Sequence, residues 1–332
     1  MDKSKQSPFW QRLTNFAKAQ RIGGIWWLIL LIFLGMSAST VIIWRSLLED
    51  RPSQVNNNLQ IEIAPIQPQQ GLQPSSATQL IFAGSGVGLE VTRILAKQFQ
   101  KTHPKIKINV PASIGSRGAI QAVVDRAITV GMISRPLKEK EKKLGLTIIP
   151  FAQTPLAMAV HPSVSDNNIT STQLKDIYQG KQSQWLDGKE IIVLTREPGD
   201  SSILVLEDKI SGFKQIYADS QSSDRWTTLY QDQEMNQLIE KTPLALGLSD
   251  VGTITSEKKL SSIKVLKFNG VAPTIENVAK GKYPLVKNLY FVFPQEQVSA
   301  NAKEFISFVQ SKEGAKILKA HNYLAVETEN KK

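Results

Sequence analysis

The chain contains no cysteine and only three histidines among its 332 residues. Without cysteine it can form no disulfide, thiolate metal site or cysteine nucleophile, and it offers no N-terminal cysteine for a lipid. His103, His161 and His321 lie far apart in the sequence, which argues against a histidine zinc site or a Ser-His-Asp triad. We therefore expect no enzyme activity, no metal and no cofactor. A phosphatase that uses carboxylates alone is the least favoured alternative.

The composition is that of a basic globular protein. Hydrophobic residues make up 41% of the chain, the formal net charge is +11, and the length suggests two domains. A basic protein can bind nucleic acid, an anionic membrane or small anions. No stripe of Lys and Arg interleaved with aromatic residues is present, so we expect no nucleic-acid partner.

One long apolar run lies near the N-terminus. Residues 25–44 contain no charged side chain, and Trp26, Trp27 and Trp44 stand at the two ends of the run. Twenty residues can span a hydrocarbon core of about 30 Å, and Trp favours the membrane interface. Five Lys and Arg side chains precede the run, so the positive-inside rule predicts that residues 1–24 are cytoplasmic. We expect an uncleaved, single-pass signal anchor in the cell (inner) membrane, with the rest of the chain periplasmic or extracellular.

A cleavable signal peptide is the alternative interpretation of this run. Residues 37–39, Ser-Ala-Ser, have the small side chains of a cleavage site, but the run exceeds the roughly 7–15 residues of a signal h-region. Residues 45–78 follow, and from Pro52 onward they are rich in Gln, Asn, Pro and Ser. That composition predicts a flexible linker between the membrane and a folded domain.

Strand-like and helix-like apolar patterns alternate from residue 79 onward. In the first part we expect strands at 80–83, 106–110 and 128–133 and helices at 88–101 and 119–126. In the second part we expect helices at 170–178, 202–210, 232–240, 300–310 and 312–320 and strands at 191–194, 244–248 and 289–293. Such alternation predicts an α/β fold with a parallel sheet covered by helices.

Three loops of glycine and serine follow short apolar strands, at 84–88, 115–118 and 199–202, and each leads into an expected helix. A helix N-terminus has unpaired backbone N–H groups and the positive end of the macrodipole. Glycine lets an anion approach that backbone, and serine adds hydroxyl donors. Three such ends in one cleft would bind a tetrahedral oxyanion, although each loop alone is also an ordinary turn.

Several segments resemble, in order, the phosphate-binding proteins of phosphate ABC transporters, which are members of the type 2 periplasmic-binding-protein superfamily. The segments are Ile81–Ser85, Gly115–Ile120, Val130–Leu137, Thr195–Ser202, Pro243–Val251, Lys282–Tyr290 and Phe305–Leu324. Together they extend over residues 79–326. The resemblance implies an α/β, two-lobed periplasmic-binding-protein-like fold (type 2), here with an N-terminal transmembrane helix.

The resemblance also implies an organisation and a function. Lobe one would comprise 79–158 and 266–326, and lobe two 159–265, with the ligand between them and closure about a hinge. The protein would capture phosphate outside the cytoplasm and deliver it to an ABC transporter permease. Two alternatives stand beside this function: a receptor for another oxyanion (sulfate, molybdate or tungstate), and an anchored sensor or scaffold that kept the fold without transport.

Individual residues carry the implied site. Arg196 matches the arginine of the family's Arg-x-x-Gly-Ser-Gly-Thr loop, and a guanidinium can hold an oxyanion through two N–H donors. Ser85, Ser116 and Ser134 map onto family hydroxyl positions, although serine there can also simply cap a helix. The ligand-binding residues that we predict are Gly84, Ser85, Gly86, Ser116, Arg117, Ser134, Arg135, Arg196, Gly199, Asp200, Ser201 and Ser202.

The sequence departs from the family pattern in three loops. Gly86 and Val87 stand where the family usually has hydroxyl residues, and Asp200 and Ser201 replace a Ser-Gly pair. Asp200 could accept a hydrogen bond from a protonated oxyanion such as monohydrogen phosphate, and it would reject sulfate. Arg135 occupies the place where some members have an aspartate.

Two arginines leave the charge of the site open. Arg117 and Arg135 either add positive charge to the anion site or point to solvent. The ligand-binding role of both residues is therefore an expectation that depends on where their side chains lie.

Overall fold

The computed structural model describes residues 78–260, 262–295 and 298–326. Their elements, in chain order, are β1 (Thr78–Gly84), α3 (Leu89–Thr102), β2 (Ile106–Asn109), α4 (Gly115–Val124), β3 (Val130–Ile133), α5 (Glu139–Lys142), β4 (Leu146–Val160), β5 (Asn168–Ile169), α6 (Ser171–Gln179), β6 (Ile192–Arg196), α7 (Ser201–Lys209), α8 (Phe213–Ser222), β7 (Thr227–Leu229), α9 (Asp232–Lys241), β8 (Ala245–Asp250), α10 (Val251–Ser256), a 3-10 turn (Lys258–Leu260), β9 (Lys264–Phe268), α11 (Ile275–Ala279), β10 (Val286–Pro294), α12 (Ala300–Val309), α13 (Lys312–Ala320) and β11 (Leu324–Ala325).

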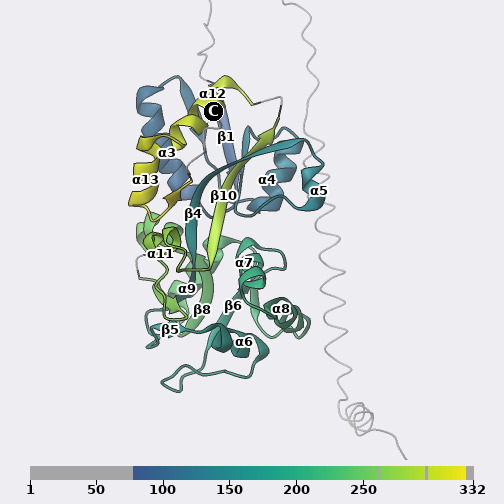
Figure 1. Cartoon of the computed structure of the whole chain (residues 1–332), viewed down its shortest axis with the longest axis vertical. Helices are drawn as coiled ribbons and strands as arrows, with labels where there is room; N and C mark the ends of the chain where they lie inside the picture. Colours follow the sequence, from purple (N-terminus) through teal and green to yellow (C-terminus); the bar gives the residue numbers. More distant parts are fainter. Residues whose placement is uncertain (1–77, 261, 296–297, 327–332) are drawn as a thin grey trace, which may run out of the picture. The chain divides into compact units, whose positions relative to one another are not determined.

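The strands form one mixed sheet in the order β2-β1-β3-β10-β4-β8-β6-β7. The outer pairs are parallel, as expected, since β1 runs parallel to β2 and β3, and β6 runs parallel to β7 and β8. The centre is antiparallel: β10 pairs antiparallel with β3 and β4, and β4 pairs antiparallel with β8. The prediction of a parallel sheet is therefore wrong for the central strands, which connect the upper and lower parts of Figure 1.

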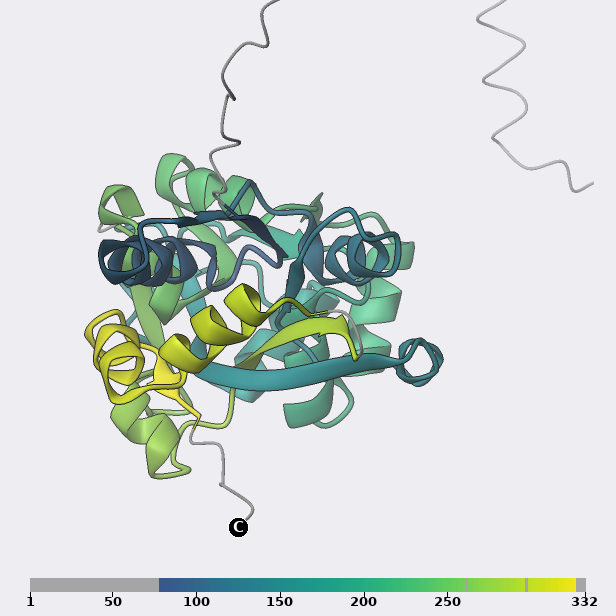
Figure 2. The same cartoon turned by 90° about the horizontal axis from the view of Figure 1, so that it is seen from above.

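Two large groups of buried residues lie one in each lobe, and two smaller groups lie beside them. In lobe one, Phe82 of β1 lies edge-on to Phe305 of α12, with ring centroids 5.0 Å apart, and Phe99 of α3 packs on the same ring. α3 and α4 lie on opposite sides of the lobe-one strands, as the view from above shows (Figure 2). Burial of aromatic and aliphatic side chains on both faces stabilises an α/β lobe of this kind.

The second core lies around β4, β6 and β8. It contains Leu174 and Tyr178 of α6, which were expected on a helix, together with Trp185. Leu266, Phe268, Tyr283 and Leu285 pack into this second core as well. The boundaries of the lobes stay a prediction, and we propose from this packing that the chain returns to lobe one after Leu285, along β10.

The predicted anchor at residues 25–44 lies outside the described residues, as do the cytoplasmic segment 1–24 and most of the linker 45–78. In the part that the structure describes, no helix has both the length and the apolar character needed to cross a membrane.

Candidate functional site

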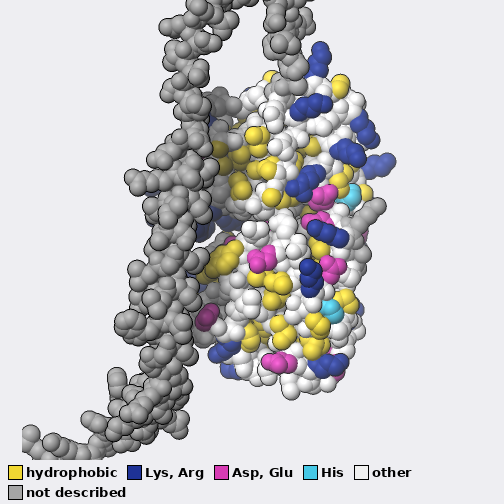
Figure 3. Space-filling view, turned by 180° about the vertical axis from the view of Figure 1, so that it is seen from behind, with side chains coloured by type: hydrophobic (Ala, Val, Ile, Leu, Met, Phe, Trp, Pro, Cys, Tyr) yellow, Lys and Arg dark blue, Asp and Glu magenta, His cyan; other side chains and the backbone are white. Residues whose placement is uncertain are grey.

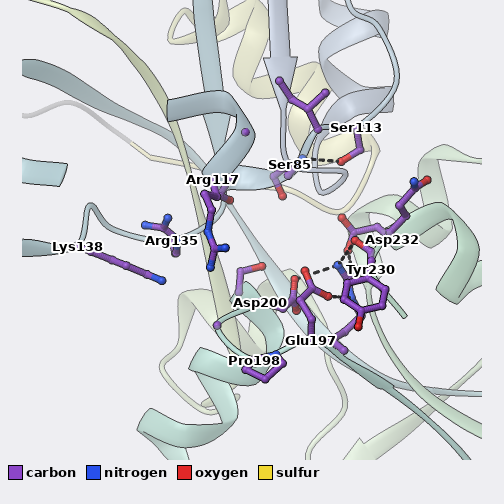
Figure 4. Close-up of a pocket in the computed structure, with 18 residues that line it drawn as sticks. Ser85, Ser113, Arg117, Arg135, Lys138, Glu197, Pro198, Asp200, Tyr230 and Asp232 are labelled. Atoms are coloured by element: carbon purple, nitrogen blue, oxygen red, sulfur yellow. Dashed lines mark hydrogen bonds and ion pairs between the residues drawn. The ribbon is translucent and has the colours of Figure 1, made fainter. Parts of the chain in front are cut away.

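A cavity of about 560 Å³ lies where loops of the two lobes meet. Lobe one contributes the end of β1, the start of α4 and the segment after β3, and lobe two contributes the β6–α7 and β7–α9 loops (Figure 4). The cavity is lined by Ser85, Ser113, Ile114, Gly115, Ser116, Arg117, Gly118, Arg135, Lys138, Arg196, Glu197, Pro198, Gly199, Asp200, Ser201, Tyr230, Gln231 and Asp232.

The first turn of α4 faces the cavity. The segment that we predicted as a loop, 115–118, is already helical, and α4 begins at Gly115, which has a φ of +68° that favours glycine. The backbone N–H of Gly115 donates to Ser113 Oγ at 3.3 Å, whereas the N–H groups that follow it in this turn have no partner within the helix and can bind an anion. Arg117 is exposed and extends from this turn toward the loop of Asp200 (Figure 4), so this residue lines the cavity instead of pointing away from it.

Four of the predicted serines form a connected hydroxyl cluster. Ser134 Oγ lies 2.8 Å from Ser85 Oγ and donates a hydrogen bond of 2.9 Å to Ser201 Oγ. The backbone N–H of Ser134 donates to Ser116 Oγ at 3.2 Å. Because Ser134 belongs to lobe one and Ser201 to lobe two in our prediction, this cluster joins the two walls of the cavity.

Arg196 is buried in the lobe-two wall, with 3% of its side chain exposed. Its Nη1 lies 2.5 Å from Asp232 Oδ1, its Nη2 3.2 Å from Asp200 Oδ2, and its Nε 3.2 Å from Glu197 Oε2. The carbonyl oxygens of Leu229 and Tyr230 accept two further hydrogen bonds from this guanidinium. A bidentate grip on an oxyanion would require Arg196 to give up some of these partners, so its binding role stays a prediction.

The electrostatics of this group follow from burial and charge. Burial alone would lower the pKa of Arg196, but Asp232, Asp200 and Glu197 raise it above its ordinary value. Burial would likewise raise the pKa of Asp232, but the positive charges of Arg196 and Lys287 hold it below its ordinary value. Arg196 and Asp232 are therefore both ionised near neutral pH, and three carboxylates lie around one guanidinium.

The lobe-one wall carries the remaining positive charge. Arg135 is 5% exposed and forms two hydrogen bonds of 2.7 Å with the carboxylate of Glu141, so it points neither to solvent nor freely into the cavity. Lys138 places its ammonium beside Gly199, where an added Cβ would lie 3.5 Å from Nζ. Among residues 78–260, 262–295 and 298–326, Arg117 and Lys138 have no ion-pair partner. An anion would therefore meet these two cations first.

Four predicted residues do not line the cavity. Gly84 packs on β3, where an added Cβ would lie 1.9 Å from the carbonyl oxygen of Met132, and Gly86 lies against Asp232. Ser134 is buried behind the wall, although its hydroxyl holds the serine cluster together. The backbone N–H of Ser202 donates to Asp200 Oδ1 at 2.8 Å, an N-cap hydrogen bond, and Ser202 Oγ is buried with no hydrogen-bond partner in the described structure.

The sequence reasoning missed several lining residues. Glu197 lies inside the loop that we singled out, and its place next to Arg196 was the available signal. Asp232 begins a helix that we predicted, but β7, the three-residue strand that brings it to Arg196, has no clear pattern. Lys138 and Tyr230 are exposed loop residues without a motif. No group of three or more His, Cys, Asp or Glu among the described residues could hold a metal ion.

The arrangement is a cleft between two α/β lobes, lined by backbone donors, serine hydroxyls and cations, which is typical of a protein that binds a small anion. The family model of the PBP superfamily domain matches residues 71–313, and the chain belongs to this superfamily of two-lobed binding proteins.

The chain is also similar in sequence to proteins that have names. The chain is 25% identical, over 246 residues, to the phosphate-binding protein PstS of Bacillus subtilis, covering 73% of this chain and 78% of the relative. It is 25% identical over 260 residues to the protein SphX of Synechococcus elongatus, covering 71% and 75%.

Solved structures share the fold. A protein from Clostridium perfringens that was crystallised with bound phosphate has a TM-score of 0.67 at 24% identity, covering 75% of this chain and all of that one. An ABC-type phosphate transport receptor from Vibrio cholerae has a TM-score of 0.54 at 23% identity, covering 74% and 99%. These two likenesses establish the two-lobed architecture.

Proposed function

We propose that the protein binds inorganic phosphate in the cavity between its lobes and passes it to an ABC transporter permease, without chemical conversion. One observation carries the proposal: the first turn of α4, the serine cluster and two cations that have no ion-pair partner among the described residues, Arg117 and Lys138, converge on one interlobe cavity. The named relatives that bind or transport phosphate support the choice of ligand.

In this proposal the two walls have different roles. The lobe-one wall attracts and holds the anion through Arg117, Lys138 and the N–H groups that follow Gly115 in the first turn of α4. The lobe-two wall contributes Ser201 and the Arg196 group. Ser85 and Ser116 contact the anion when their hydroxyl hydrogens rotate toward the cavity.

The carboxylates of the cavity favour a protonated ligand. Asp200, Glu197 and Asp232 surround a single arginine and would repel a fully ionised anion. A carboxylate oxygen can accept a hydrogen bond from monohydrogen phosphate, whereas sulfate has no proton to donate at neutral pH. The carboxylate acceptors of the cavity therefore favour protonated phosphate over sulfate, molybdate and tungstate, which carry no proton at neutral pH.

Two exposed arginines, one in α4 and one just after it, give a matched test of the site. Arg117→Gln removes an exposed cation at the start of α4, and Arg126→Gln removes one just past its end. We expect Arg117→Gln to weaken phosphate binding by roughly tenfold in equilibrium dialysis, because a charge-assisted contact is lost, and Arg126→Gln to leave it unchanged. Equal behaviour of the two variants, or no phosphate bound by the wild-type chain, would contradict the proposal.

We also propose that residues 25–44 anchor the protein in the membrane with the binding lobes outside the cytoplasm. The uncharged run, the flanking Trp residues and the preceding basic segment support this proposal. Alkaline carbonate extraction of cell membranes should leave the full chain in the pellet and release a chain that begins at Gln79. Release of the uncleaved chain would contradict the anchor, and release of a chain shortened past residue 44 would mean that the run is a cleaved signal peptide.

A further inference from the structure

Asp232 connects the two lobes at the edge of the cavity. It is the first residue of α9, in lobe two, and it lies against Gly86, in the lobe-one loop between β1 and α3. A Cβ added to Gly86 would lie 2.3 Å from Asp232 Oδ2 and 2.7 Å from its Cβ. Only a residue without a side chain therefore allows this approach, and the backbone amide of Gly86 lies close enough to the Asp232 carboxylate to lower its pKa.

The same carboxylate holds Arg196 with its other oxygen. Asp232 Oδ1 lies 2.5 Å from Nη1 of Arg196, the shortest of the three contacts between this guanidinium and a carboxylate. Asp232 is 17% exposed and lines the cavity, so solvent and small ions reach it. One carboxylate thus lies against a backbone amide of lobe one and pairs with a cationic donor of lobe two.

These two donors are of the kind that an oxyanion between the lobes would use. A loop N–H ahead of a helix and a guanidinium both bind phosphate oxygens well. We propose that Asp232 is an internal competitor for the anion. Its carboxylate takes the place of a ligand oxygen and links the two lobes through Gly86 and Arg196, a contact that we call the clasp. The carboxylate must release both groups when an anion binds. The inference rests on the proposed function of this cavity.

Glu197 provides the contrast that isolates this role. Its carboxylate also pairs with Arg196, at 3.2 Å, and it also lines the cavity. The three atoms nearest to the Cβ position of Gly86, however, all belong to Asp232. Removal of either charge relieves repulsion of an anion, but only removal of the Asp232 charge weakens the clasp.

The test compares Asp232→Asn with Glu197→Gln in the full chain, titrated with inorganic phosphate. We expect Asp232→Asn to bind phosphate about tenfold more tightly than the wild type, because a competing charge is lost, and Glu197→Gln to change the affinity clearly less. A second arm measures amide hydrogen exchange at Gly86. This amide should exchange faster in Asp232→Ala than in Glu197→Ala, and phosphate should slow its exchange in both.

Each outcome decides the question. If Asp232→Asn weakens phosphate binding, or changes it no more than Glu197→Gln, Asp232 is a positioning residue for Arg196 and the competitor role is wrong. If the Gly86 amide exchanges at the same rate in Asp232→Ala and Glu197→Ala, Asp232 does not link the lobes through Gly86. If the wild-type chain binds no phosphate, the proposed function fails separately, and the Gly86 amide still shows whether Asp232 clasps the lobes.

Discussion

The positive charge of Arg196 is neutralised by residues of the same wall of the cavity. Three carboxylates and two carbonyl oxygens accept hydrogen bonds or ion pairs from one guanidinium that is 3% exposed. A buried arginine needs such partners, because an unpaired buried charge is costly. In the proposed function, the attraction for an anion therefore comes from Arg117 and Lys138 across the cavity, while Arg196 connects the lobe-two loops.

Asp250 is a buried carboxylate at the end of β8. It caps α10 by accepting hydrogen bonds from the N–H of Thr253 at 2.8 Å and from its hydroxyl at 2.9 Å, and it is 2% exposed. Burial raises its pKa to about 6, against the opposing effects of the Lys287 charge and the Thr253 hydrogen bonds.

This shift predicts a pH dependence of stability. The unfolded aspartate has a pKa of about 3.9, so between about pH 4 and pH 6 the folded state keeps a proton that the unfolded state has lost. The contribution of Asp250 is therefore full below pH 4 and is lost as the pH rises through 6, by up to about 3 kcal/mol. Asp250→Asn, which can still cap the helix, should remove this part of the slope in urea unfolding measured from pH 4 to pH 7.

Asp208→Asn is the control for that comparison, since its carboxylate is 70% exposed. Its unfolding free energy should follow the wild-type slope across the same pH range. A wild-type slope in Asp250→Asn as well would show that this buried carboxylate does not set the dependence.

The site residues that sequence reasoning found lie at strand ends followed by Gly and Ser. Ser85, Ser116, Arg196, Asp200 and Ser201 all line the cavity, because strand ends of an α/β lobe bring such loops together. Their binding roles stay predictions. Residues that reach the cavity through tertiary packing gave no local signal. Asp232 is the clearest example, since it meets a loop residue 146 positions earlier in the chain (Gly86).

At the scale of elements, the strongly periodic helices were predicted well. α3, α9, α12 and α13 occur within one or two residues of the expected ranges. α4 begins four residues earlier than expected, because Gly115 and Gly118 suggested a loop, whereas the backbone of this segment is helical. That difference matters for function, since it turns a proposed binding loop into the first turn of a helix, whose N–H groups face the cavity.

The long central strand was missed altogether. β4 runs from Leu146 to Val160 and contains Pro150 and Pro155, which interrupt the pattern of a central strand. It is nonetheless paired on both sides, with β10 along much of its length and with β8 and β9 at its end. The mixed sheet could not be predicted without it, because four of the five antiparallel strand pairs in the described structure include β4.

At the scale of the molecule, the two lobes differ in charge. The ranges that we predict for lobe one, 79–158 and 266–326, contain 20 Lys and Arg against 8 Asp and Glu, whereas range 159–265 contains 11 against 15. Lys and Arg side chains accordingly dominate the upper part of the surface in Figure 3, and Asp and Glu lie mostly on the middle and lower part. Such a field steers an anion toward the lobe-one wall, where Arg117 and Lys138 lie.

The central claim is that this interlobe cavity binds phosphate in preference to other oxyanions. The most direct measurement is a calorimetric titration of the full chain with phosphate and, separately, with sulfate, near neutral pH. We predict saturable binding of one phosphate per chain, with a dissociation constant on the order of a micromolar or tighter, and sulfate binding at least about tenfold weaker. No saturable heat with phosphate, or equal affinity for sulfate, would contradict the account.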